Sequence, residues 1–357
     1  MTELDRESVE GRLAGIVDPH TGSNLVESNE VKDIRIEDGT VRIEVNLGYP
    51  AKSWEPELVG MIQEAVPGAN VEVKSNTVSH EVQEGIKPLR GVKNIIAVAS
   101  GKGGVGKSTL SVNLALALSS EGARVGILDA DIYGPSQPRM LGVSGQPTSK
   151  DGKSLEPMNS YHVQAMSIGF LVDEESPMIW RGPMVTQALE QLLNDTNWDD
   201  LDYLIIDMPP GTGDTQLTLA QKVPVSGSVI VTTPQDIALL DARKAYKMFE
   251  KVDIPVLGVV ENMSTHICSQ CGHEEHIFGL GGGEDMAKQY GTELLGNVPL
   301  ARSIRENADG GCPSVVADPD SPIAGVYRQI ARNMAARLSM RKKDYSSKFP
   351  NIVIQQN

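Results

Sequence analysis

Short runs rich in apolar residues recur through most of the chain and predict buried β-strands. They lie at residues 95–99, 123–128, 203–206, 228–233, 256–260 and 294–298. Apolar residues at helical spacing predict α-helices at residues 110–118, 237–250, 284–290 and 323–340. Strands that alternate with helices form parallel sheets with helices on both faces. The pattern therefore predicts an α/β fold with a mostly parallel sheet for this part of the chain.

The first part of the chain has a different pattern. Helices are predicted at residues 5–14 and 56–65, and strands at residues 31–36, 40–47 and 70–73. The turn Glu37-Asp38-Gly39 joins the first two strands. We therefore expect a small α+β domain at residues 1–79, ahead of the larger α/β domain.

Charge and proline positions predict the remaining boundaries. Residues 80–94 form a charged stretch in which Pro88 disfavours a continuous helix, so we expect a linker there. The larger domain then extends over residues 95–340, and residues 341–357 form a tail. In the tail, Pro350 interrupts any amphipathic helix that could target a membrane.

The composition limits the compartment and the partners. The 357 residues carry a formal net charge of -15, which argues against nucleic acid and against an anionic membrane surface. With only 3 cysteines there is no disulfide framework, as in a reducing cytosol. Residues 1–10 are too charged for a secretory signal, and no apolar run of about 18 residues could span a bilayer. We expect a cytoplasmic protein with no membrane and no nucleic-acid partner.

A glycine-rich segment between a predicted strand and a predicted helix fits the pattern Gly-x-x-x-x-Gly-Lys-Ser. It consists of Gly101, Lys102, Gly103, Gly104, Val105, Gly106, Lys107, Ser108 and Thr109. In such a P-loop, backbone N–H groups and the helix N-terminus bind phosphate oxygens. We expect Lys107 to reach the β- and γ-phosphates of ATP and the Ser108 hydroxyl to help hold Mg²⁺.

Carboxylates follow two other predicted strands. Asp129 and Asp131 come directly after the strand at residues 123–128, and Asp207 ends the strand at residues 203–206. Parallel sheets bind their ligands at this carboxyl edge. These side chains are therefore candidates for the same site as the P-loop.

Two of the cysteines form the pair Cys268-Ser269-Gln270-Cys271. A Cys-x-x-Cys pair alone is compatible with zinc, with a redox dithiol or with an iron-sulfur cluster. For zinc, two of His266, His273 and His276 would have to complete the ligand set within one chain. The remaining cysteine, Cys312, is more typical of a buried apolar filler than of a ligand.

The P-loop carries a second lysine directly after its first glycine, and in this it resembles the deviant Walker A loop of the MinD, ParA and nitrogenase iron protein group. The resemblance implies that Lys102 reaches across a dimer interface to the partner's nucleotide; a solvated loop lysine is the alternative. It implies that Asp131 is the switch I aspartate, which positions the attacking water or contacts the metal. Asp207 would be the Walker B carboxylate that holds Mg²⁺.

Two further residues match positions of the same group. Gly211 would be a switch II sensor whose N–H lies near the γ-phosphate. Asn262 would contact adenine, although an asparagine after a strand is also typical of a plain turn.

The string from Cys268 to Gly283 is similar to that of the Mrp (ApbC-like) iron-sulfur cluster carrier ATPases. Residues 131–136 and 207–214 match the same family, and the small domain resembles the iron-sulfur-associated domain that precedes the ATPase in many of its members. The resemblance implies a slow ATPase that binds a labile cluster and transfers it to acceptor apoproteins. A MinD/ParA-type positioning ATPase with a structural zinc at the Cys-x-x-Cys pair is the alternative.

Ligand number adds a constraint on the assembly. A 4Fe-4S cluster takes four thiolates, whereas this chain has 3 cysteines. One Cys-x-x-Cys pair from each of two protomers supplies four, so we expect a homodimer with the cluster on its two-fold axis. The small domain has no cysteine after its second predicted strand, so we expect it to serve docking or structure rather than cluster binding.

Overall fold

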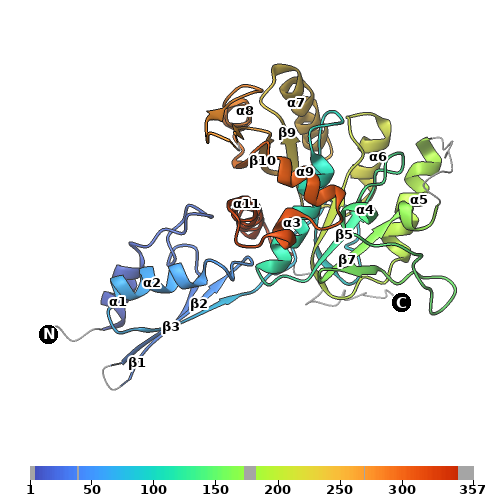
Figure 1. Cartoon of the computed structure of the whole chain (residues 1–357). Helices are drawn as coiled ribbons and strands as arrows, with labels where there is room; N and C mark the ends of the chain where they lie inside the picture. Colours follow the sequence, from blue (N-terminus) through green and yellow to red (C-terminus); the bar gives the residue numbers. More distant parts are fainter. Residues whose placement is uncertain (1–4, 38–39, 173–181, 269, 345–357) are drawn as a thin grey trace, which may run out of the picture.

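The computed structural model describes residues 5–37, 40–172, 182–268 and 270–344. A small domain formed by the first part of the chain lies beside a larger α/β body (Figure 1). Two predictions fall on positions outside the described residues. These are the turn at Glu37-Asp38-Gly39, of which Glu37 alone is described, and the effect of Pro350 in the tail.

The small domain is a three-stranded sheet with two helices on one face. Its elements are α1 (Arg6–Leu13), β1 (Val31–Glu37), β2 (Thr40–Leu47), α2 (Glu55–Ala65) and β3 (Asn70–Ser75). β1 pairs with β2 antiparallel, and β2 pairs with β3 parallel. Because side chains alternate between the faces of a strand, Ile43 and Val45 point to the helices with Leu58 of α2, whereas Arg42 on β2 is exposed.

The larger body is built on an eight-stranded sheet. Its strands are β4 (Val92–Ala99), β5 (Val125–Asp129), β6 (Met158–Ser160), β7 (Val163–Ser167), β8 (Leu201–Asp207), β9 (Gly227–Thr232), β10 (Val256–Asn262) and β13 (Leu294–Val298). They lie in the order β13-β10-β9-β4-β8-β5-β7-β6, and β6 alone is antiparallel to its neighbour. Every residue of β5, β8 and β9 is buried, as expected for central strands covered on both faces.

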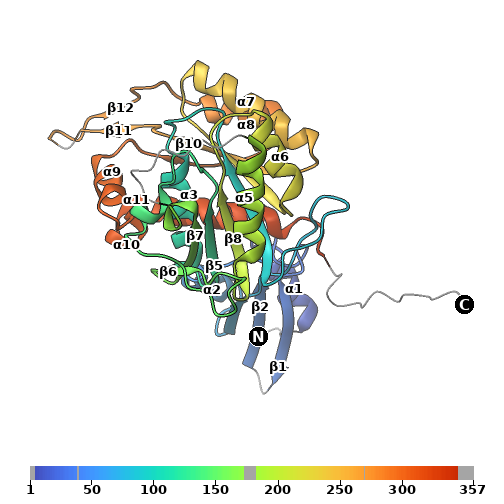
Figure 2. The same cartoon turned by 90° about the vertical axis from the view of Figure 1, so that its right-hand side faces the viewer.

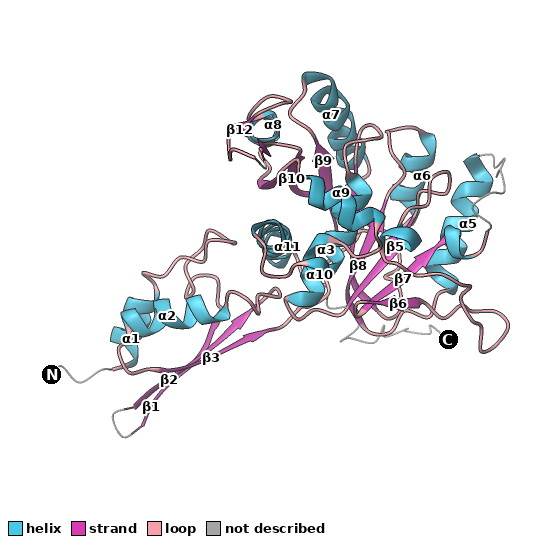
Figure 3. Ribbon diagram, viewed as in Figure 1, coloured by secondary structure: helices cyan, strands magenta, loops and turns pink. Residues whose placement is uncertain are grey.

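Helices cover both faces of this sheet (Figure 3). One face holds α3 (Lys107–Ser120) and α11 (Pro322–Ser339), and the other holds α5 (Gly182–Asp195), α6 (Asp214–Lys222), α7 (Asp236–Lys251) and α8 (Gly282–Tyr290). Shorter helices are α4 (Gln137–Met140), α9 (Arg302–Asp309) and α10 (Ser314–Ala317), with a 3₁₀ turn at Ile168–Phe170. The predicted fold class, with its preceding α+β domain, is confirmed. In the described part of the chain, no helix is both long and apolar enough to cross a bilayer.

The two parts of the molecule meet at the C-terminal end of α3. There the buried carboxylate of Glu121 accepts hydrogen bonds from Ser53 N (2.8 Å) and Ser53 Oγ (2.5 Å) of the small domain. It also accepts from Arg332 Nη1 of α11 at 2.7 Å. A second contact joins His20 Nδ1 to Asn333 Oδ1 at 3.0 Å. Because α3 begins at Lys107, the small domain is fixed to the far end of the helix that follows the P-loop.

The segment between the two parts lies on the larger body. His80 is buried, and its Nδ1 is 2.9 Å from Asn94 Oδ1 on β4. Gln83 Nε2 donates to Ala220 O (2.8 Å) on α6. Glu81 N donates to Lys342 O at 3.0 Å, so residues that follow α11 pair with this segment. The charged stretch therefore adopts a fixed course along the body, although it contains no helix.

The free energy of unfolding should depend on the ionisation of Glu30 in the small domain. Its side chain is buried and accepts a hydrogen bond from Ser28 Oγ (3.0 Å). Burial, with the charge of Asp18, raises the pKa of Glu30 from 4.5 to about 7. The folded protein then favours the neutral acid. The contribution of Glu30 to the free energy of unfolding is fully present below pH 4.5 and is lost as the pH rises through about 7. At pH 7 this loss reaches about 3 kcal/mol.

Urea unfolding of wild type and Glu30→Gln from pH 4 to pH 8 measures this effect, because the glutamine cannot ionise. The variant should gain stability relative to wild type as the pH rises through that window. Parallel pH profiles for the two proteins would show that Glu30 ionises freely in the fold.

Candidate functional site: a P-loop at the carboxyl edge of the sheet

Three central strands end side by side at the carboxyl edge of the sheet. β4 leads into the P-loop, β8 ends at Asp207 and β5 ends at Asp129. Asp129 and Asp207 are direct partners in the pairing of β5 with β8. The order in which successive strands are added reverses at β4. β5, the next strand in sequence, lies on one side of β4, and β9 lies on the other side. Such a switch point is where open α/β sheets bind ligands.

The P-loop backbone depends on glycine at two close approaches. A Cβ atom on Gly101 would lie 2.1 Å from the backbone carbon of Asp241 on α7. A Cβ atom on Gly106 would lie 2.1 Å from Asn262 Nδ2, and Gly106 also has φ +83°, which favours glycine. The close packing at Gly101 and Gly106 therefore leaves no room for a side chain at either position. α3 begins at Lys107, within the P-loop, so the free N–H groups of its first turn lie in the loop.

Asp207 is the centre of a buried polar cluster. Its Oδ1 is 2.5 Å from Lys107 Nζ and accepts from Ser111 Oγ at 3.0 Å. Its Oδ2 accepts from Gln137 Nε2 at 2.8 Å. Lys107 Nζ also lies 3.2 Å from Ser108 Oγ. The predicted lysine, serine and carboxylate of the nucleotide site thus lie together, and the carboxylate is fully buried.

Asp129 fixes the segment that follows β5. Its Oδ2 accepts from Ser136 N (2.9 Å), Gln137 N (3.0 Å) and Ser167 Oγ (3.2 Å). Burial, and next the charge of Asp207, raises the pKa of Asp129 to about 7. Two carboxyl groups this close favour a bound cation, because a cation would offset their repulsion.

Asp131 lies in the same segment. Its N–H donates to Asp129 Oδ1 at 3.2 Å, and partial burial raises the pKa of its own carboxyl group. Lys102 is half-buried in the P-loop, where its carbonyl accepts from Ser100 Oγ at 2.9 Å.

Two more predicted residues lie against the P-loop segment. Asn262 is the last residue of β10, and its Nδ2 donates to Val105 O at 2.8 Å. Gly211 N donates to Ser100 O at 2.9 Å, so a γ-phosphate would have to replace that carbonyl to receive the Gly211 N–H.

The cysteine pair lies at the tip of a two-stranded arm. β11 (His266–Ile267) pairs antiparallel with β12 (Glu274–Glu275), and the arm projects from the body (Figure 2). Cys268 N donates to His273 O and Gly272 N donates to Cys268 O, each at 2.9 Å. Cys271 is exposed and Cys268 is half-buried.

Backbone hydrogen bonds favour the thiolate of Cys268. The N–H groups of Gln270 and Cys271, and then the Cys271 thiol, lower the pKa of Cys268 below its usual value. A thiolate is the form that binds metals. The arm thus presents two thiols, neither of them in a disulfide, with one disposed to ionise.

Two of the three histidines near the cysteine pair have backbone partners. His266 Nδ1 lies 3.0 Å from Leu300 O, and His276 Nδ1 lies 3.2 Å from Ser264 O. His273 Nε2 is 3.8 Å from a carboxylate oxygen of Glu275. Within the ranges that the structure describes, no three or more His, Cys, Asp or Glu side chains are grouped as a metal site.

Exposed apolar side chains lie on the arm, on the segment after it and on α7. On the arm and the segment after it these are Ile267, Ile277 and Leu280, with exposed fractions of 58%, 52% and 73%. On α7 they are Ile237 and Leu240, with 68% and 54%. The two groups are adjacent, because the backbone at Gly282 lies against Leu239 of α7. This surface, the arm–α7 surface, is a candidate for contact with another protein.

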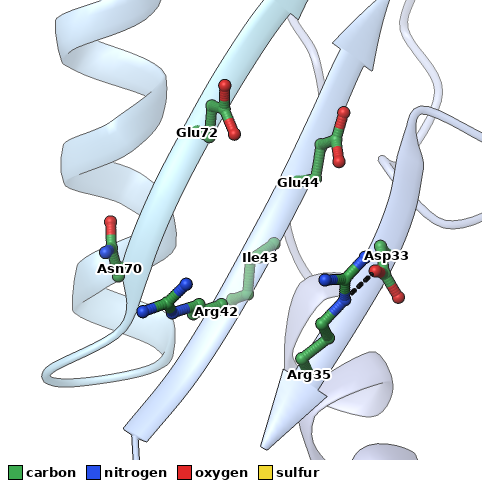
Figure 4. A pocket seen from close by; sticks show the side chains of 7 residues that line it. All are labelled: Asp33, Arg35, Arg42, Ile43, Glu44, Asn70 and Glu72. Carbon is green, nitrogen blue, oxygen red and sulfur yellow. Dashed lines mark hydrogen bonds and ion pairs between the residues drawn. The ribbon is translucent and has the colours of Figure 1, made fainter.

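A further recess lies on the outer face of the small domain, away from the P-loop (Figure 4). It is lined by Asp33, Arg35, Arg42, Ile43, Glu44, Asn70 and Glu72. Arg35 Nε lies 2.5 Å from Asp33 Oδ2, and Lys74 Nζ is 3.0 Å from both Glu44 and Glu72. Exposed ion pairs of this kind are typical of a solvated sheet face.

Comparison with known protein families assigns the chain. A family model described as NUBPL iron-transfer P-loop NTPase matches residues 91–335. The chain belongs to this family. A second model, described as iron-sulfur cluster assembly protein, matches residues 6–79, which form the small domain.

Curated relatives agree with this assignment. The iron-sulfur cluster carrier protein of Pseudomonas fragi is 63% identical over 270 residues, which are 75% of this chain and 94% of that protein. The iron-sulfur cluster carrier protein of Escherichia coli (strain K12) is 51% identical over 343 residues, covering 94% of this chain and 93% of the relative. The iron-sulfur cluster transfer protein NUBPL of Mus musculus is 48% identical and covers 79% of this chain and 88% of the relative.

Solved structures show the same fold. A nucleotide-binding protein from Archaeoglobus fulgidus in complex with ADP is 35% identical, with a TM-score of 0.57, over 66% of this chain and 93% of that chain. The cell division ATPase MinD of Pyrococcus furiosus is 24% identical, with a TM-score of 0.52, over 68% and 98% of the two chains, and supports the fold alone. The predicted family and the P-loop ATPase class are confirmed, and the cluster carrier interpretation is favoured over the positioning ATPase. The predicted roles of single residues stay predictions.

Three contributors to the site were not predicted. Ser111 and Gln137 bind Asp207, and the Asp241 backbone requires a glycine at position 101. The spacing of Ser111 from Lys107, one helical turn, is a signal that could have been used. Gln137 and Asp241 reach the site through tertiary structure and carry no such signal.

Lys107→Ala should weaken ATP binding by roughly 10- to 100-fold, the range for hydrogen bonds to charged groups. The wild-type Lys107 ammonium is the only charged side chain within the described cluster that donates to Asp207. Isothermal titration with a slowly hydrolysed ATP analogue measures this. Lys93→Ala is the matched control, because Lys93 pairs with Asp202 (2.7 Å) at the opposite edge of the sheet. Equal affinity in Lys107→Ala and Lys93→Ala would place the phosphates elsewhere.

Proposed function

We propose that this protein is an ATP-dependent iron-sulfur cluster carrier: it binds a labile cluster at a homodimer interface and transfers it to acceptor apoproteins. The observation that carries the proposal is the joint presence of a P-loop and an accessible Cys-x-x-Cys pair at the tip of an arm. The family assignment supports it, because the relatives are named as iron-sulfur cluster carriers.

For the nucleotide, the P-loop residues 101–109 bind the phosphates of ATP, and Lys107 leaves Asp207 to reach them. Asp131 positions the attacking water, and Gly211 senses the γ-phosphate after it exchanges its bond to Ser100 O. Asn262, whose Nδ2 donates to Val105 O, contacts adenine in this proposal. Hydrolysis is slow, as suits a switch.

Magnesium fits the oxygen donors present. The Ser108 hydroxyl and the Asp207 carboxylate would hold it, and Mg²⁺ prefers such hard oxygen ligands. The neighbouring carboxyl group of Asp129 and the burial of Asp207 both favour a cation there. When bound, the ion would neutralise charge on the phosphates. The protein's own contribution is to orient Asp207, through Ser111 and Gln137.

For the cluster, Cys268 and Cys271 supply two thiolates per protomer. A 4Fe-4S cluster takes four, so two arms hold one cluster on the two-fold axis. The arm–α7 surface supports this arrangement, because it includes Ile267, the residue before Cys268, and its exposed apolar side chains would be covered by the partner protomer. Each protomer then holds only half of the ligands, and a small rotation of the protomers would strain the cluster and favour its release.

Transfer of the cluster should fail in Cys268→Ala and in Cys271→Ala. After anaerobic reconstitution, wild type should be brown with broad visible absorption and about four iron atoms per dimer, because thiolates hold the cluster. Each variant should lose iron while it keeps ATP affinity, since the P-loop is unchanged. Cys312→Ala is the matched control and should keep the iron, because Cys312 lies between α9 and α10, outside the arm.

Metal analysis separates the proposal from its alternative. Stoichiometric zinc in wild type, with no uptake of iron under reducing and oxygen-free conditions, would overturn the carrier function in favour of a positioning ATPase with a structural zinc.

Lys102 should couple nucleotide state to cluster transfer. If it reaches the partner's nucleotide, both sites act through one dimer equilibrium, and a typical coupling of roughly 1 to 3 kcal/mol gives a 5- to 150-fold effect of ATP on cluster affinity in wild type. Lys102→Ala should hold the cluster normally, because no thiolate is lost, but its transfer to an apo-ferredoxin-like acceptor should not respond to Mg-ATP. Circular dichroism follows the transfer.

Lys251→Ala serves as the control, because Lys251 is exposed at the end of α7 remote from the P-loop. The same ATP response in wild type, Lys251→Ala and Lys102→Ala would show that Lys102 is a solvated loop lysine.

A further inference from the structure

Gln137 joins three parts of the nucleotide site. It is the first residue of α4, and only 1% of its surface is exposed. Its Nε2 donates to Asp207 Oδ2 at 2.8 Å and to Ser108 O at 3.1 Å. Its backbone N donates to Asp129 Oδ2 at 3.0 Å. One residue therefore connects the end of β8, the P-loop and the end of β5.

The hydrogen bonds of Gln137 define the orientation of its amide. Both neighbours of Nε2 are oxygen acceptors, a carboxylate and a carbonyl, so the NH₂ group must face them. The amide oxygen Oε1 then points away from these two acceptors, and it is buried with no hydrogen-bond partner among the described residues. Buried amide oxygens nearly always have a partner, so an unpaired one beside a binding site indicates a donor that arrives with the ligand.

The chemistry of the site identifies that donor. Oε1 can only accept a hydrogen bond, and it is bonded to the same carbon as the Nε2 that touches Asp207 and Ser108 O. Mg²⁺ binds few protein ligands and keeps several water molecules, whose hydrogens are donors. Residues that orient metal ligands or metal-bound water commonly lie one contact away from the ion.

We propose that Gln137 is a positioning residue for the hydrated magnesium ion of Mg-ATP. Its Nε2 orients the Asp207 carboxylate, and its Oε1 accepts a hydrogen bond from a magnesium-bound water. The proposal rests on the magnesium site at Ser108 and Asp207 that the proposed function contains. It adds a residue to that site, and it links the ion to the segment of Asp131, because Asp129 holds the Ser136 and Gln137 N–H groups.

Nucleotide binding with and without magnesium tests this. ADP affinity is measured by titration calorimetry in Mg²⁺ and in EDTA, for wild type and Gln137→Met, which keeps the side-chain length and removes the amide. Wild type should bind ADP more tightly with Mg²⁺. Gln137→Met should lose roughly 10- to 100-fold in the presence of Mg²⁺, as expected for hydrogen bonds to charged groups, and little in EDTA.

Gln164→Met is the matched control. Gln164 on β7 also binds through both amide atoms, to Asp199 O (3.2 Å) and Asp199 N (3.1 Å), but at the start of its strand, opposite the P-loop. It should retain the full magnesium effect. If Gln137→Met fails to fold, Gln137→Asn replaces it: the shorter side chain keeps an amide but cannot reach Asp207 and should lose the magnesium effect equally.

The possible results distinguish a failure of the proposed magnesium site from a failure of the proposed role of Gln137. A wild-type affinity that does not depend on Mg²⁺ would overturn the magnesium site of the proposed function itself. A wild-type magnesium effect that persists unchanged in Gln137→Met or Gln137→Asn would overturn the role of Gln137 alone. Equal losses with Mg²⁺ and with EDTA would show that Gln137 only supports the fold of the P-loop, which also contradicts the proposal.

Discussion

The buried ion pair between Lys107 and Asp207 is the interaction on which the site depends. The lysine belongs to the P-loop after β4 and the aspartate ends β8, so the pair connects the two central strands at their carboxyl edge. Neither charge could stay buried without the other, because an unpaired buried charge is strongly destabilising. In the proposed function, ATP with a divalent cation would offer each partner a replacement: phosphate oxygens for Lys107 and the cation for Asp207. In the free protein Lys107 and Asp207 thus neutralise each other, whereas in the nucleotide complex they would bind different partners.

The cysteine arm is a direct continuation of the nucleotide site. β10 ends at Asn262, whose side chain holds the P-loop carbonyl of Val105, and the chain enters β11 at His266. Between them, Met263 has a left-handed backbone (φ +57°), and Ser264 Oγ donates to Val298 O on β13 at 3.2 Å. This short, anchored connection gives a physical route by which a change at the P-loop could tilt the thiols. The small domain, in contrast, contacts the opposite end of α3 at Glu121.

Much of the fold and part of the nucleotide site could be predicted from the sequence, because short-range patterns of residues encode them. Apolar runs marked the central strands, and the P-loop glycines and Lys107 are recognisable by spacing. Asp207 was a candidate because it ends a buried strand, and its role came from a family resemblance. β6, at one edge of the sheet, and its neighbour β7 were not predicted, and neither were α5 and α6. β6 is too short to show a period, and residues 80–91 gain their fixed course from contacts with β4 and α6 rather than from propensity. The contacts of Gln137 and the backbone of Asp241 depend on residues far apart in sequence, which no local pattern records.

The central claim is that two protomers share one cluster between their arms. Native mass spectrometry of the anaerobically reconstituted protein tests it most directly, since it reports the number of chains and the bound metal in one measurement. The account predicts a dimer that carries one 4Fe-4S cluster, and apoprotein monomers once the cluster is removed by chelation in the absence of nucleotide. A monomer that retains iron, or a monomer that carries one zinc ion, would contradict it.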